Sequence, residues 1–152
     1  MDFKKLRTQL IWVFLLIPLS SFNEAFSETG ITLIVDVSNL RNSKGEVQFA
    51  LYNKKGTIPD EDYTKYYKKL RAKIKEGKSI VVFENLPTGT YAINVFHDEN
   101  ENNKIDKGLI FPKEGIGFSN FKSIGFTNIP SFEKASFNLS SNQKKTIKVI
   151  YM

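Results

Sequence analysis

The chain has 152 residues, a formal net charge of +6, one histidine and no cysteine. This length predicts a single domain. The absence of cysteine excludes a disulfide framework, and a lone histidine without cysteine excludes a zinc site of the usual kind. The lysines are scattered, and arginine is not interleaved with aromatic residues as in a nucleic-acid-binding face. We therefore expect no nucleic-acid partner.

Residues 1–27 have the three parts of a secretory signal peptide. Basic residues come first, an apolar run covers 10–17, and small residues stand one and three positions before Glu28. The apolar run is about half of the roughly 20 residues that a membrane-spanning helix needs. We therefore expect cleavage before Glu28 and a periplasmic or secreted protein of residues 28–152, with no transmembrane segment remaining.

Apolar and polar residues alternate in several short segments of the mature chain, which is the pattern of half-buried strands. These segments are 31–37, 46–51, 69–75, 80–83, 91–95, 135–139 and 147–151. About seven short strands separated by turns predict an all-β antiparallel sandwich of the immunoglobulin-like or transthyretin-like kind. The basic residues at alternate positions of 69–75 predict a solvated strand face.

One segment, 59–69, departs from this alternation. Acidic residues lead it, basic residues end it, and Tyr63, Tyr66 and Tyr67 recur at helical spacing. We expect a short surface helix that joins two strands. Its tyrosines either pack onto the sheet or, if they are exposed and coplanar, form a carbohydrate-binding platform.

An acidic, asparagine-rich loop follows the strand over 91–95. Five of its residues occupy positions 1, 3, 5, 7 and 9 of an EF-hand-like calcium loop, namely Asp98, Asn100, Asn102, Lys104 and Asp106. Two departures weaken the pattern, because Asn103 replaces the usual glycine and Leu109 replaces the bidentate glutamate. The sequence leaves two interpretations open: a weak calcium site, completed by a ligand such as Glu114, or a metal-free loop held by Asx turns.

His97 directly precedes this loop. With Asp98 or a serine it could act as the general base of a small hydrolase, although no nucleophile motif such as G-x-S-x-G places a serine. The alternative is a structural histidine that hydrogen-bonds the loop. Exposure of His97 beside a pocket would favour the enzyme, and burial would favour the structural role.

The segment 112–133 is long and carries interleaved phenylalanines and glycines. Loops of this length in compact domains are either functional or packed by their own side chains. We expect it to cover an open end of the sandwich as a plug, and a ligand groove walled by its phenylalanines is the alternative.

Several motifs together resemble the uncharacterised secreted family catalogued as domain of unknown function 2141. They are Phe96-His97-Asp98-Glu99-Asn100, Pro112-Lys113-Glu114-Gly115, Gly117-Phe118-Ser119-Asn120 and Pro130-Ser131-Phe132-Glu133. The resemblance covers about 31–151 and implies an exported bacterial sandwich domain, without an established activity. The family's usual loop reads Asp-Glu-Asn-Gly-Asn-Gly-Lys-x-Asp, so Glu101 and Asn103 replace both glycines and stiffen the loop.

These observations favour a non-enzymatic binding or structural module of the cell envelope. Its partner would be an envelope or extracellular ligand, and calcium is the cofactor that the acidic loop suggests. A small hydrolase using His97 and Asp98, and a carbohydrate-binding domain using the tyrosines of 59–69, are the alternatives.

Overall fold

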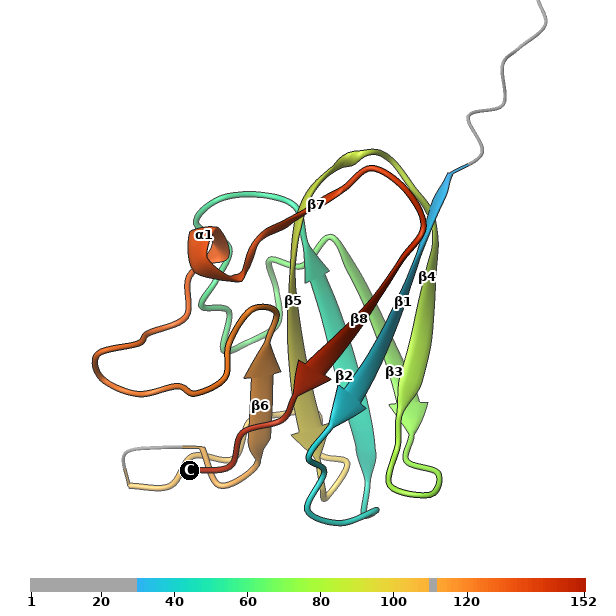
Figure 1. Ribbon diagram of the computed structural model, residues 1–152. Coiled ribbons are helices and arrows are strands. Elements are labelled where there is room, and N and C mark those ends of the chain that lie inside the picture. The colour runs from blue at the N-terminus through green and yellow to red at the C-terminus, as the bar shows by residue number, and fades with distance from the viewer. Residues whose placement is uncertain (1–29, 110–111) are drawn as a thin grey trace, which may run out of the picture.

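The computed structural model of the protein describes residues 30–109 and 112–152, and the predicted signal peptide lies outside them. The described residues form eight strands and one short helix: β1 (Ile31–Ser38), β2 (Glu46–Tyr52), β3 (Lys68–Lys73), β4 (Ile80–Leu86), β5 (Gly89–Asp98), β6 (Gly115–Phe118), α1 (Phe132–Ala135), β7 (Phe137–Leu139) and β8 (Gln143–Lys148). Figure 1 shows their arrangement in two facing layers. The predicted all-β sandwich is thereby confirmed.

One sheet has three strands in the order β4–β1–β8, and the other has five, β3–β2–β5–β6 with β7 also paired to β5. All strand pairs are antiparallel except β1 with β8, which run parallel. The main core lies between the sheets and contains Leu33, Phe49, Phe83 and Val95, each at most 1 % exposed. The alternation seen in the sequence therefore points one set of side chains into this interior.

The five-stranded sheet is buried on its outer face as well. A second apolar cluster there includes residues from β2, β5 and β6, namely Ala50, Tyr52, Ala92, Phe96, Ile116 and Phe118. The loop before β3 and the segment between β6 and β7 cover this face with Ile58, Tyr63, Phe121, Phe132 and Ala135. The double coverage explains why every residue of β5 after its first two is buried.

The prediction of a helix over 59–69 is wrong. The Asp60 carboxylate accepts hydrogen bonds from the backbone of Thr64 and Lys65, which makes a compact turn. Tyr63 has a φ of 50° and is buried against Phe96. The chain then joins the edge of β2 and continues as β3, so tertiary packing overrides the helical spacing. The short helix of the fold is α1, which Ser131 caps by accepting from the Lys134 backbone.

The basic stripe of 69–75 is only partly a solvated face. Arg71 is half-buried and donates to Glu46 at 2.6 Å and to Gln48 at 2.8 Å. Lys73 pairs with Glu101 of the acidic loop at 2.6 Å. The edge strand β3 is therefore tied electrostatically to β2 and to that loop.

The strand β6 lies within the segment that the sequence predicted as a continuous loop. Its Gly117 faces the interior, where a Cβ would lie 2.4 Å from the Lys148 carbonyl oxygen and 2.9 Å from Val95. Glycine is needed here because β8 passes so close. The rest of the segment covers the outer face of the five-stranded sheet rather than an end of the sandwich. Within 30–109 and 112–152, no helix is long and apolar enough to cross a membrane.

Candidate functional site

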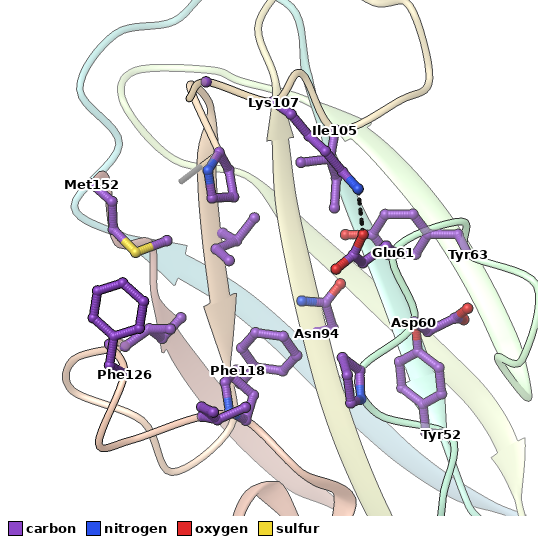
Figure 2. A pocket seen from close by; sticks show the side chains of 18 of the residues that line it. Tyr52, Asp60, Glu61, Tyr63, Asn94, Ile105, Lys107, Phe118, Phe126 and Met152 are labelled. Carbon is purple, nitrogen blue, oxygen red and sulfur yellow. Dashed lines mark hydrogen bonds and ion pairs between the residues drawn. The ribbon is translucent and has the colours of Figure 1, made fainter. Parts of the chain in front are cut away.

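An apolar pocket of about 400 Å³ opens on the outer face of the five-stranded sheet. It is walled by three segments far apart in sequence: the loop before β3, the end of the acidic loop, and the segment after β6. Its apolar lining includes Tyr52, Tyr63, Ile105, Ile116, Phe118, Ile124, Phe126, Ile129 and Met152. Figure 2 shows several of them around a common hollow, namely Tyr52, Tyr63, Ile105, Phe118, Phe126 and Met152. The volume is at the lower end of the range for small-molecule sites.

Exposed apolar side chains surround the mouth of the pocket. Phe126 is 76 % exposed and Ile129 is 59 % exposed, and both line the pocket. Met152 at the end of the chain is also exposed there. Exposed apolar side chains around a pocket are typical of a surface where an apolar molecule binds and removes them from water.

Few polar groups reach the pocket. Asn94, in the middle of β5, is 4 % exposed and donates from Nδ2 to the Gly117 carbonyl oxygen at 3.2 Å. The hydroxyl of Tyr52 donates to Asp60 at 3.1 Å. Glu61 and Lys107 form an ion pair that joins the loop before β3 to the acidic loop (Figure 2). A few placed polar groups in an apolar lining are typical of a ligand site.

Asp98 organises the start of the acidic loop from a buried position. Its side chain is fully buried, and its two oxygens accept from the backbone nitrogens of Asn102 at 3.1 Å and Asn103 at 2.9 Å. Arg71 lies 3.9 Å from the same carboxylate. The loop therefore curls around the Asp98 side chain.

The other predicted metal-ligating side chains lie close to one another. The amide nitrogens of Asn100 and Asn102 both donate to Asp106, at 2.6 and 3.1 Å. The side-chain oxygens of the same asparagines accept from backbone nitrogens two residues on, as in Asx turns. The Lys104 side chain is exposed, and its backbone nitrogen is the donor to Asn102.

Glu114, the residue directly before β6, closes the loop. It is 4 % exposed, and its two oxygens accept from the backbone nitrogens of Glu99 at 2.9 Å and Asp106 at 3.1 Å. Burial raises the pKa of the Glu114 carboxyl, against those two hydrogen bonds, and the charges of Asp106 and Asp98 raise it further. The carboxylates of this end of the molecule therefore repel one another, which a bound cation would relieve.

Calcium binding nevertheless remains a prediction. Within the described residues no group of three or more His, Cys, Asp or Glu side chains is arranged to hold a metal ion. The side-chain oxygens of Asp98, Asn100, Asn102 and Asp106 all accept hydrogen bonds from nitrogens of the loop, and a calcium ion would have to replace these donors.

His97 is completely buried on the core side of β5. Its Nε2 lies 2.8 Å from the Lys44 carbonyl oxygen and must carry the proton, because a carbonyl only accepts. Its Nδ1 therefore accepts from the Tyr151 hydroxyl at 2.6 Å. Both ring nitrogens are used, and the pocket lies on the opposite face of the sheet. This geometry gives the hydrolase alternative no support.

We expect His97→Gln to lower the free energy of unfolding by about 1 kcal/mol, the size of one typical buried hydrogen bond. Glutamine can replace one of the two bonds of the imidazole but not both at once. Urea unfolding of the mature protein measures the change. A hydrolytic activity that disappeared in His97→Gln at unchanged stability would contradict the structural role.

The tyrosines of 59–69 do not share one exposed face. Tyr63 is 6 % exposed, whereas Tyr66 and Tyr67 are about two-fifths exposed. Tyr66 lies against Lys69, and Tyr67 lies against Tyr91. The three rings therefore have separate environments, and the arrangement gives no support to a carbohydrate platform.

Sequence reasoning identified the acidic loop but missed the pocket and Asn94. One signal was available, since Asn94 stands between Ile93 and Val95 in a strand that is otherwise apolar. A polar residue inside such a strand needs a partner and is often functional.

The described residues form a small all-β sandwich whose covered outer face has an apolar pocket as its candidate ligand site, beside an acidic loop. The chain belongs to DUF2141, a family of uncharacterized proteins conserved in bacteria, whose model matches residues 35–148. That match confirms the resemblance drawn from the loop motifs. No curated protein and no solved structure matches the chain.

Proposed function

We propose that the protein is a non-enzymatic binding module of the bacterial cell envelope that takes a small, largely apolar ligand in the pocket on the outer face of the five-stranded sheet. The observation that carries the proposal is Asn94, a buried amide placed inside an apolar pocket of about 400 Å³. The Asn94 nitrogen donates to Gly117, but no described residue donates to the Asn94 oxygen. This free acceptor in an apolar lining favours a ligand over simple packing.

Binding of an apolar fluorescent probe tests this proposal. Phenylnaphthylamine gains fluorescence when it leaves water for an apolar site, and we expect saturable binding with one probe per chain. Ile124→Trp places a bulky ring into the pocket lining and should reduce the affinity at least tenfold. The matched control is Ile80→Trp on the exposed face of the other sheet, where Ile80 is 48 % exposed. Equal binding by both variants would contradict the proposal.

Export is the first requirement of this function. We expect a tagged chain to appear outside the cytoplasm, shortened by the predicted 27 residues of the signal peptide. Fractionation followed by mass measurement of the amino terminus tests it. A full-length chain in the cytoplasm, or one held in the membrane by an intact amino terminus, would contradict an envelope function.

Calcium binding by the acidic loop is a second proposed property. It is favoured by Asp98 and Glu114, two buried carboxylates that hold opposite ends of the loop and repel each other's charge. A cation bound among Asp98, Asn100, Asn102, Asp106 and the Lys104 carbonyl would offset this repulsion. In this role calcium fixes the loop that supplies Ile105 and Lys107 to the pocket.

Calcium should raise the melting temperature of the chelator-treated protein, because the ion binds only the folded loop. Magnesium should do so less, since it requires compact octahedral geometry. The pKa of Glu114 is higher in the folded protein than in the unfolded chain, so this carboxyl favours folding at pH values below its unfolded pKa. That contribution to stability is lost as the pH rises through the folded pKa. The calcium effect should therefore grow from pH 4.5 toward neutrality.

The control for the calcium experiment is Asn100→Ala, which removes a neutral oxygen and should weaken the effect less than Asp98→Asn, which removes a charge. A melting temperature that stays flat up to several millimolar calcium, the range of weak extracellular sites, would reject the site. The loop would then be held by its own hydrogen bonds, without a metal ion.

A further inference from the structure

The two polar atoms of the Asn94 side chain differ in their hydrogen bonding. Asn94 donates through Nδ2 to the Gly117 carbonyl oxygen, and a carbonyl can only accept, so the amide orientation is fixed. Figure 2 shows the Asn94 oxygen turned away from β6, on the pocket side. Among the described residues this Oδ1 accepts no hydrogen bond, although the side chain is only 4 % exposed. The pocket therefore contains an accessible acceptor, on an otherwise buried side chain, to which no described residue donates.

The charged groups around the pocket are also mainly hydrogen-bond acceptors. Two of the lining residues, Asp60 and Glu61, are carboxylates, and the described lining contains a single basic residue, Lys107. Glu61 already holds that ammonium in an ion pair. A ligand entering the pocket therefore meets the Asn94 acceptor and one net negative charge among the described lining residues. Tyr63, whose buried hydroxyl has no hydrogen-bond partner in the described part of the chain, also lines the pocket and can donate.

We infer that the ligand is an apolar molecule whose polar end donates a hydrogen bond to Asn94, as a hydroxyl or an ammonium group does, in preference to an amphiphile whose polar end is a carboxylate. This inference rests on the proposed binding function. A donor at this point pairs Oδ1 when the ligand covers it, whereas a hydrocarbon covers it without giving it a partner. A carboxylate offers only acceptors to Asn94, and the described lining has one net negative charge, because Lys107 offsets one of the two carboxylates.

Four naphthalene probes of matched shape test the inference by displacement of phenylnaphthylamine from the mature protein. They are naphthylmethanol, naphthylmethylamine, methylnaphthalene and naphthoate. We expect the alcohol and the amine to bind roughly tenfold tighter than the hydrocarbon, the ratio that one net hydrogen bond gives. Naphthoate should be the weakest of the four. Tighter binding of the alcohol would indicate a ligand with a neutral polar end, and tighter binding of the amine would indicate a cationic one.

Asn94→Leu should bring the affinity of the alcohol down to that of methylnaphthalene, while leaving the hydrocarbon itself bound. The four-probe comparison on the unsubstituted chain stands alone if this variant does not fold. Equal affinities for all four probes, or tightest binding of naphthoate, would overturn the inference and leave the binding function intact. Failure of every probe, phenylnaphthylamine included, would overturn both.

Discussion

Asp98→Ala should lower the free energy of unfolding by about 3 kcal/mol, the lower end of the cost of removing one partner from a buried charged network. The substitution deletes the acceptor of two backbone hydrogen bonds that curl the acidic loop. It also leaves the half-buried Arg71 with less negative charge around it. For a domain of this size the melting temperature should fall by roughly 10 °C.

The matched control is Asp106→Ala in the same loop. Asp106 is partly exposed and accepts only from the exposed amides of Asn100 and Asn102, so its loss should cost less than about 1 kcal/mol. Calorimetry in the presence of a chelator compares the two variants without any contribution from metal. Equal effects would mean that Asp98 does not organise the loop.

Gly45→Ala should destabilise the fold by at least about 3 kcal/mol, because two costs add. Gly45 has a φ of +67°, which disfavours any residue with a Cβ. The added Cβ would also lie 1.9 Å from the Asp98 carbonyl oxygen, so either the turn before β2 or the end of β5 must move. The end of β5 holds the acidic loop, and binding at the pocket should weaken together with stability.

Gly77 offers the matched control for this prediction. It has a φ of +71°, but nothing lies within 4 Å of the position of its missing Cβ. Gly77→Ala should therefore cost only the backbone term, about 1 kcal/mol. Urea unfolding of both variants separates the two costs. A Gly45→Ala variant no less stable than Gly77→Ala would show that the close approach to Asp98 is relaxed without cost.

The strands that the sequence predicted well are those in which alternation is long and local. The strands β1, β2 and β4 begin within one residue of their predicted starts, and β5 contains the predicted 91–95. The strand β6 was missed because four residues containing two glycines have almost no periodic signal. Its strand character comes from pairing with β5 and from the close approach of β8.

The site was predictable only in part, for a related reason. The acidic loop is a contiguous motif, so Asp98, Asn100, Asn102 and Asp106 could be grouped from spacing alone. The pocket is assembled from three segments that are distant in sequence. Because 59–69 was predicted as a surface helix, its contribution to the pocket wall could not be recognised. Tyr63 illustrates the difference, since its burial against Phe96 depends on a contact between distant segments.

The central claim is that the pocket on the outer face of the five-stranded sheet binds a ligand. The most direct test is a titration of the isotope-labelled mature protein with naphthylmethanol, followed by nuclear magnetic resonance. The account predicts saturable shifts at the Asn94 side-chain amide and at the backbone of Ile116 and Phe118. Shifts confined to the exposed apolar residues of the other sheet, such as Ile80 and Val82, would contradict it.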